Sequence, residues 1–119
     1  MALTLNNVYK DKAARVNSQE DNVRFIQAFM SSLYEVFAEL EAQCHITPTY
    51  ISSPEEDTGL NRQYLPVISA GLDHFLTQRS EWNVDDPVKL ERTWLRALSK
   101  AAGIYYKDNT IVGRYGDLS

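Results

Sequence analysis

The stretch of residues 18–44 constrains the fold more than any other, because its spacing predicts a single long amphipathic helix. Its apolar residues recur at three- and four-residue steps, which places their side chains on one helical face. These residues are Ile26, Met30, Leu33, Phe37, Leu40 and Cys44, and Phe25, Phe29 and Val36 widen the face beyond a coiled-coil seam. Ser18 is predicted to cap the first turn, with Gln19, Glu20 and Asp21 at the positive end of the helix dipole. The stretch predicts a small helical domain, and none of its residues suggests a chemistry.

Two further helices are predicted downstream. The second carries an apolar face of Tyr64, Val67, Ile68, Leu72, Phe75 and Leu76. Proline is tolerated only in a first turn, so Pro66 predicts that this helix begins between residues 61 and 65 or is kinked there. Gly71 lies in its middle at a cost of about 1 kcal/mol relative to Ala. We expect another backbone, that of the long helix, to approach closely at this glycine.

The third helix should begin at Asp85-Asp86-Pro87, since an acidic cap followed by proline is a specific start signal. Its apolar face consists of Val88, Trp94, Leu95, Leu98, Ala102 and Tyr105. Together the three patterns predict an all-α fold: a small bundle of three main helices with a long loop between the first two and extended N- and C-terminal arms. The predicted core consists of Ile26, Phe29, Leu33, Phe37, Leu40, Val67, Ile68, Leu72, Phe75, Trp94, Leu95 and Leu98.

The chain of 119 residues has the length of one compact domain. We divide it into an N-terminal arm (residues 1–17), a helical domain (18–106) and a C-terminal extended tail (107–119). The N-terminal arm has few apolar residues, so it is either loosely packed or ordered by a partner.

The loop of residues 45–59 holds two prolines and three consecutive acids, and loops of this length are usually functional or mobile. Its residues 46–51 are β-branched and rich in threonine, which favours a short extended piece, and Pro48 would confine such a strand to an edge. The acidic run is most simply a solvated tip. Four loop residues are candidates for binding a partner: Tyr50, Glu55, Glu56 and Asp57.

The C-terminal tail is predicted to become ordered only on a partner. Four of its thirteen residues are large and apolar, whereas fixing each backbone costs about 1–2 kcal/mol. A partner strand could supply the missing hydrogen bonds, with Ile111 and Val112 paired and Arg114 free to meet an acidic surface. The candidate partner-binding residues of the tail are Ile111, Val112, Arg114 and Tyr115.

Composition argues against several classes of function. The net charge of −4 argues against tight binding to nucleic-acid phosphates, and the basic residues look scattered, with Lys10, Lys12 and Arg15 as the only local cluster. A single cysteine excludes an internal disulfide. No stretch approaches the roughly 18 apolar residues that a membrane span needs, and we expect neither a membrane partner nor a secretory signal.

No catalytic residue, metal site or cofactor is predicted, and we expect no enzymatic activity. Cys44, His45 and His74 lack the paired spacing of zinc sites. Asp73 and His74 are helix neighbours that point about 100° apart, so they cannot form an oriented dyad. The run of residues 113–116 has two glycines but no following helix to bind a phosphate.

At Tyr64-Leu65-Pro66-Val67-Ile68-Ser69-Ala70-Gly71-Leu72-Asp73 the chain completes a distinctive layout. A long first helix, a variable loop, a second helix with small residues and glycine in its core, a third helix and an extended tail follow one another. Across residues 17–106 this layout resembles the head-to-tail adaptor (connector) proteins of tailed bacteriophages.

The resemblance implies a structural virion protein without catalytic residues. It implies a homo-oligomeric, dodecameric ring docked on the portal protein, with genomic DNA passing through and no sequence-specific DNA binding. The C-terminal tail would reach onto the portal, and the loop would meet the next tail or neck protein, such as a stopper or tail terminator. The implied location is the phage neck in the virion, and the host cytoplasm during assembly.

Two features of the sequence agree with this resemblance. Acidity suits a channel through which DNA slides without sticking, and extended arms suit strand addition to a neighbour. The N-terminal segment, however, is longer and more basic than a minimal adaptor needs. The alternative interpretation is a small helical protein-binding or regulatory module with no enzymatic activity.

Overall fold

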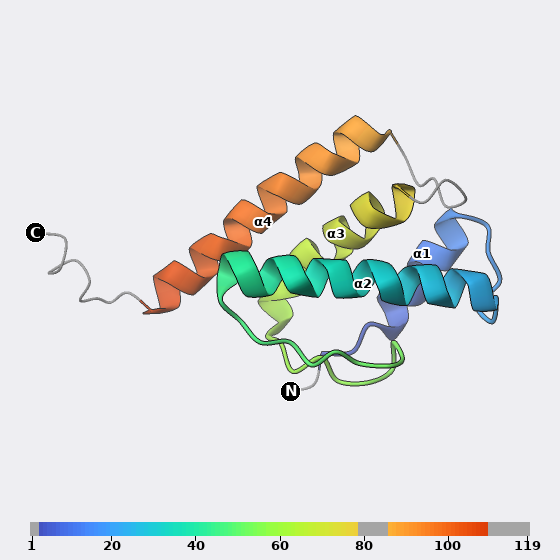
Figure 1. The fold of residues 1–119 in the computed structure, drawn as a ribbon, viewed down its shortest axis with the longest axis horizontal. Coiled ribbons are helices and arrows are strands. Elements are labelled where there is room, and N and C mark those ends of the chain that lie inside the picture. The colour runs from blue at the N-terminus through green and yellow to red at the C-terminus, as the bar shows by residue number, and fades with distance from the viewer. Residues whose placement is uncertain (1–2, 79–85, 110–119) are drawn as a thin grey trace, which may run out of the picture.

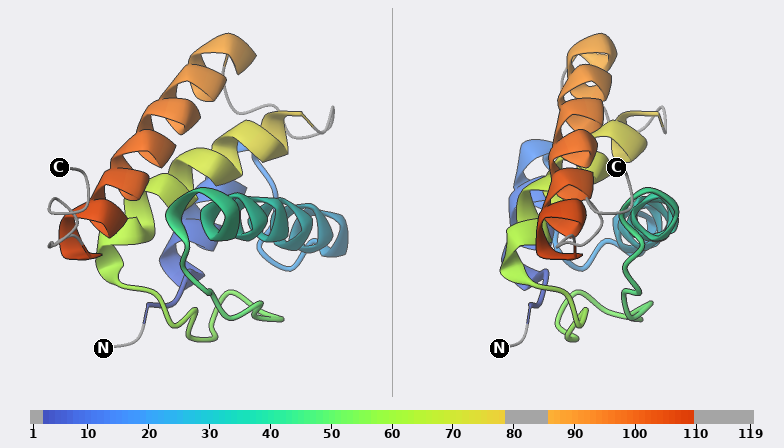
Figure 2. Two further views of the ribbon diagram at one scale, coloured as in Figure 1. Left: turned by 60° about the vertical axis from the view of Figure 1, so that its left-hand side comes forward. Right: turned by 90° about the vertical axis from the view of Figure 1, so that its left-hand side faces the viewer.

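The computed structural model describes residues 3–78 and 86–109, with side chains as far as residue 103 (Figure 1). Four α-helices and one 3-10 turn follow in the order α1 (Asn6–Arg15), α2 (Val23–Cys44), η1 (Arg62–Tyr64), α3 (Leu65–Thr77) and α4 (Pro87–Asn109). The described residues contain no strand, which confirms the predicted all-α class. Helix α3 packs between α2 and α4, and Figure 2 shows α1 and the loop before η1 on the side away from α4.

The long helix is present but starts later than predicted. Asn22, not Ser18, caps it: the Asn22 side chain accepts hydrogen bonds from the backbone amides of Arg24 (2.9 Å) and Phe25 (3.4 Å). The Ser18 hydroxyl instead donates to the carbonyl of Gln19, so it does not cap a helix. At the other end His45 adopts the left-handed conformation, with φ of 57°, and terminates α2.

The expected N-terminal arm is wrong, because this segment is part of the packed fold. Leu3 and Leu5 are buried, and α1 follows directly after them. The Tyr9 ring lies edge-on to Phe29 of α2, with ring centroids 5.0 Å apart, and its hydroxyl donates to the carbonyl of Glu20. The segment has few apolar residues, but Leu3, Leu5, Tyr9 and Ala13 are buried and Val8 and Val16 pack against the core, which is enough to order it.

The predicted starts of the other two helices are confirmed. Pro66 lies in the first turn of α3, which Asn61 precedes as the cap of η1. Asp86 lies immediately before α4, and its carboxylate accepts a hydrogen bond from the amide of Val88 in the first turn (3.1 Å). Helix α4 continues to Asn109, so the predicted extended tail does not begin at residue 107. The rest of that tail, residues 110–119, lies outside the described residues.

The predicted core is largely confirmed, with one clear error. Leu95 is 54% exposed, whereas Leu90, Trp94, Leu98 and Ala101 of the same helix are buried. These four residues recur at steps of four and three and define the face of α4 that meets α3. Leu95 follows Trp94 directly and therefore points about 100° away from that face. Ile26 and Phe75 are partly buried at the edge of the core.

Gly71 lies where three helices meet. A Cβ atom at this position would lie 2.6 Å from Val36 Cγ2 of α2 and 2.8 Å from Trp94 Cζ3 of α4. A close approach was predicted here, but the neighbours are side chains of two helices rather than one backbone. Glycine therefore sets how closely α3 can pack between α2 and α4.

The loop between α2 and η1 is held down by the N-terminal segment. The amide of Leu5 donates to the carbonyl of Pro54 (2.8 Å), and the amide of Thr58 donates to the carbonyl of Leu3 (2.9 Å). Thr49 also donates to Thr58 across the loop (2.9 Å), yet residues 46–51 form no regular strand. Ile51 and Thr58 are buried. The loop is therefore a packed part of the domain, although its acidic residues face outward.

Candidate interaction surface

The predicted partner-binding residues fall into two groups. Tyr50, Glu55, Glu56 and Asp57 lie in the loop between α2 and η1, and all four are exposed. Ile111, Val112, Arg114 and Tyr115, together with the two-glycine run of residues 113–116, lie outside the described residues. The loop is thus the predicted site whose geometry is known.

Two of the loop carboxylates are fixed by hydrogen bonds. Asp57 accepts from the backbone amides of Gly59 (2.9 Å) and Leu3 (3.0 Å), and these bonds lower the pKa of its carboxyl. Glu56 accepts from the hydroxyl (2.7 Å) and amide (3.2 Å) of Ser52, which lowers the pKa of Glu56 as well. Asp57 therefore anchors the loop to the N-terminal segment, while Glu55 and Glu56 present negative charge to solvent.

Tyr50 extends this surface toward the end of α2. Its ring packs edge-on to Phe37, with centroids 5.4 Å apart, and lies 5.3 Å from the ring of Tyr34. Its hydroxyl donates to the carboxylate of Glu41 (3.0 Å). Burial is the main cause that raises the pKa of the Tyr50 hydroxyl, followed by this hydrogen bond and the charge of Glu41. With 44% of Tyr50 exposed, the ring is a supported aromatic contact surface.

The residues with reactive side chains are separated from one another. Cys44 is buried at the end of α2, where desolvation raises the pKa of its thiol. His74 stacks on Trp94, with ring centroids 6.4 Å apart, and its Nε2 lies 3.1 Å from the amide nitrogen of Gln78. Within residues 3–78 and 86–109, no group of three His, Cys, Asp or Glu side chains could hold a metal ion. Asp73 and His74 face different helices, as expected for helix neighbours.

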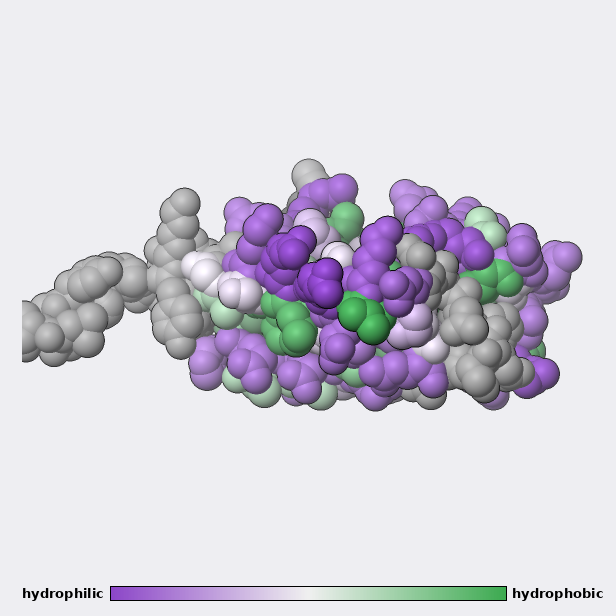
Figure 3. Space-filling model, turned by 90° about the horizontal axis from the view of Figure 1, so that it is seen from above, coloured by the Kyte–Doolittle hydropathy of each residue, from purple (hydrophilic) through white to green (hydrophobic). Residues whose placement is uncertain are grey.

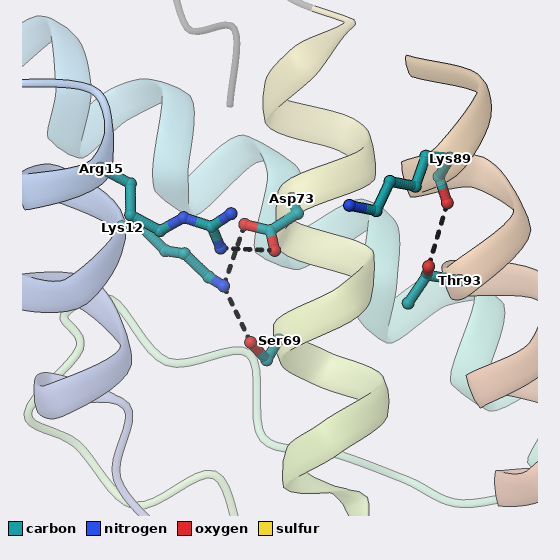
Figure 4. A network of polar contacts seen from close by, with 6 residues as sticks. All are labelled: Lys12, Arg15, Ser69, Asp73, Lys89 and Thr93. Carbon is teal, nitrogen blue, oxygen red and sulfur yellow. Dashed lines mark hydrogen bonds and ion pairs between the residues drawn. The ribbon is translucent and has the colours of Figure 1, made fainter. Parts of the chain in front are cut away.

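A buried ionic cluster joins α1 to α3, and sequence reasoning missed it (Figure 4). Lys12 Nζ lies 2.9 Å from Asp73 Oδ1 and donates to Ser69 Oγ at 2.8 Å. Arg15 Nη1 donates to Asp73 Oδ2 at 3.1 Å. Only 2% of Lys12 is exposed, whereas the Arg15 side chain is 40% exposed.

This ionic cluster positions helices rather than reacting groups. Lys12 forms an ion pair with Asp73 Oδ1 and donates a hydrogen bond to Ser69 Oγ. A buried ammonium needs a carboxylate partner, and Asp73 is that partner on α3. The spacing of Lys12 and Arg15, one turn apart on α1, was the available signal, but nothing in the sequence placed Asp73 opposite them.

A groove on the other side of α3 is the second candidate surface. It has a volume of about 360 Å³ and opens between the start of α3 and the middle of α4. Its lining is mainly apolar, from Pro66, Val67, Ala70, Ala97 and Ala101, with Arg96 and Lys100 at its α4 side. Its floor is formed by small side chains, three of them alanines, that leave the space between the two helices open.

Exposed cations continue along α4 beside this groove. Lys89, Arg92, Arg96 and Lys100 recur at steps of three and four residues, which places them on one face of the helix. All four are exposed, and Glu91 is the one acid between Pro87 and Gly103. We call these four residues the basic row. The basic residues of α4 are therefore not scattered, contrary to the sequence-based expectation, because helical spacing places them on one face.

Figure 3 shows the molecule from above, where hydrophilic residues dominate and hydrophobic ones form separate small patches. Val88 and Leu95, at 60% and 54% exposed, are the large apolar residues on the described surface of α4. Isolated apolar side chains of this kind are ordinary on a protein surface. The groove, where apolar lining and charge lie together, is therefore the stronger candidate.

Comparisons of the chain with protein-family models, with curated proteins and with solved structures found no match. In the part of the chain that the structure describes, no helix is long and apolar enough to cross a membrane.

Proposed function

We propose that this chain is a structural virion protein, a head-to-tail adaptor that assembles into a ring, docks on the portal protein and joins the capsid to the tail while DNA passes through. The observation that carries the proposal is the pairing of two unlike surfaces on one small helical domain. The loop presents carboxylates, whereas the groove presents an apolar floor beside four cations. A subunit that contacts different neighbours on different sides needs unlike surfaces of this kind.

The packing of the domain supports an assembly role. The acidic loop is held by two backbone hydrogen bonds to the N-terminal segment and by three within the loop, so its charges are held in place before any partner arrives. Preorganised surfaces lose little conformational entropy on binding. The layout of α2, the loop, α3 and α4 also has the order that the adaptor resemblance implies.

The experiment that tests the proposal is electron microscopy of the purified chain mixed with the portal protein encoded nearest to its gene. The expected result is a ring of additional density on one face of the portal. Two results together would contradict it: a portal without added density, and a gene for this chain that lies among regulatory genes rather than capsid and tail genes. That outcome would favour the alternative of a small protein-binding or regulatory module that uses the same groove.

A further inference from the structure

The groove and the basic row form one continuous docking surface on α4. Thr93, Ala97 and Ala101 line the groove, and Arg92, Arg96 and Lys100 are their neighbours on the helix surface. Arg96 and Lys100 belong to both, since they line the groove and carry the charge of the row. A molecule that covers the apolar floor must therefore meet at least two cations at its rim.

The complementary surface is present on the same chain. Glu55 and Glu56 are exposed at the acidic tip of the loop, next to Pro54. The tip borders a different hollow, between α1, the start of α2 and the loop, which shares no residue with the groove. Figures 1 and 2 show the loop and α4 on opposite sides of the molecule. The tip of one molecule thus cannot reach its own groove in the folded domain.

We propose that the groove binds the acidic loop of a second copy of this chain, with Glu55 and Glu56 against Arg96 and Lys100 and Pro54 over the apolar floor. The inference rests on the proposed function in requiring that copies assemble with one another. Because the two surfaces differ, each copy can bind one neighbour through its groove and another through its loop. Such a head-to-tail contact produces a ring when the rotation between copies closes and a filament when it does not.

Charge and lining favour a protein partner over a nucleic acid. The cations lie beside alanines, a valine and a proline, which offer apolar area but no aromatic face on which a base could stack. The cations of the basic row attract an acidic loop locally. Both carboxylates belong to a loop that is already fixed, so docking requires little reordering.

Paired charge reversals test this contact. Arg96→Glu with Lys100→Glu alters the groove, and Glu55→Lys with Glu56→Lys alters the loop. Each pair alone should weaken self-association about tenfold or more in sedimentation velocity, because like charges then face each other. An equimolar mixture of the two double variants should restore the larger assembly from alternating copies, because acidic loops then meet basic grooves and lysine loops meet glutamate grooves. All four changes in one chain should restore the larger assembly.

Asp11→Lys with Glu91→Lys is the matched control for the loop pair, since it makes the same change in net charge at exposed acids outside both surfaces. It should leave self-association within about twofold of wild type. Circular dichroism and melting temperature should match wild type in every variant, because all the altered residues are exposed.

Several results would overturn the proposal. A wild-type chain that stays monomeric at its highest attainable concentration would do so, as would a fourfold variant that does not reassociate. Salt-dependent binding of duplex DNA that is lost in the groove variant, without self-association, would assign the row to phosphates. If charge reversal had no effect on association but truncation at Asn109 abolished it, the groove would be assigned to residues 110–119. If a monomeric chain bound the portal, the proposed function would stand and this contact would be rejected. If association were restored in the fourfold variant but the portal were not bound, the contact would stand and the proposed function would be rejected.

Discussion

Helix α3 is covered on two sides in different ways. On the α1 side, Asp73 is enclosed by Lys12 and Arg15, and Ser69 completes the contact. On the α4 side, the packing is tight around Gly71 and Trp94 but leaves an open groove toward the start of α3. In the ionic cluster the carboxylate of Asp73 pairs with two cations inside the fold, whereas the basic row has its charges at the surface. The comparison indicates that the α1 side stabilises the domain and the α4 side is available to a partner.

The largest expected effect on stability is on the α1 side of α3. Asp73→Ala removes the carboxylate that faces Lys12, and an unpaired charge remains buried. We expect a loss of about 3–5 kcal/mol in the free energy of unfolding, measured by urea denaturation. The double variant Lys12→Met with Asp73→Leu should lie within about 1 kcal/mol of wild type, because no buried charge then remains. An Asp73→Ala variant as stable as wild type would show that water reaches the ionic cluster.

Substitution at the tight contact around Gly71, in the centre of α3, should have the next largest effect on the free energy of unfolding. Gly71→Ala places a Cβ atom against Val36 and the large ring of Trp94, so a loss of about 1–3 kcal/mol is expected despite the better helix propensity of alanine. Gly103→Ala is the matched control, since nothing lies within 4 Å of an added Cβ there. It should gain up to about 1 kcal/mol. Equal effects at the two glycines would contradict the packing described here.

The acidic loop should show a smaller effect that depends on pH. Hydrogen bonds lower the pKa of Asp57 in the folded state, so its contribution to stability is present above the unfolded pKa of about 4 and is lost as the pH falls through the folded pKa. Asp57→Ala should therefore lower the melting temperature at pH 7, and the difference from wild type should disappear as the pH falls below the folded pKa of Asp57. A melting difference that persists in acid would assign the effect to packing rather than charge.

The smallest effect on stability is expected in the groove. Ala97→Leu adds a larger side chain where the groove is open, so the free energy of unfolding should change by less than about 0.5 kcal/mol. Self-association through the groove should nevertheless be blocked, which sedimentation velocity would detect. Ser99→Leu, on an exposed position of the same helix, should leave association unchanged. A blocked assembly in both variants would mean that the contact extends beyond the groove.

Apolar periodicity predicted much of the fold. The long helix, the start of α3 at Pro66 and the burial of Leu72 and Trp94 follow from local spacing and from turn chemistry. The N-terminal segment was missed because its order depends on distant residues. Leu3 and Leu5 pair with Thr58 and Pro54, which lie about fifty residues away in the chain.

The candidate site was only partly predictable. The acidic residues of the loop were identified from their sequence, but the role of Asp57 as an anchor required the position of Leu3. The basic row has a clear signal at helical spacing, which an analysis restricted to apolar residues does not detect. The groove itself depends on the distance between α3 and α4, which Gly71 and Trp94 set through packing.

Amide hydrogen exchange at low and high protein concentration tests the difference between the two sides of α3 most directly. The central claim predicts that concentration increases protection in the loop of residues 52–57 and at the groove, in residues 63–70 and 93–101, while α1 is equally protected at both concentrations. Protection that rises in α1 and remains constant at the groove would contradict it. The α1 side of α3 would then be the contact between copies, and the groove would be closed to partners.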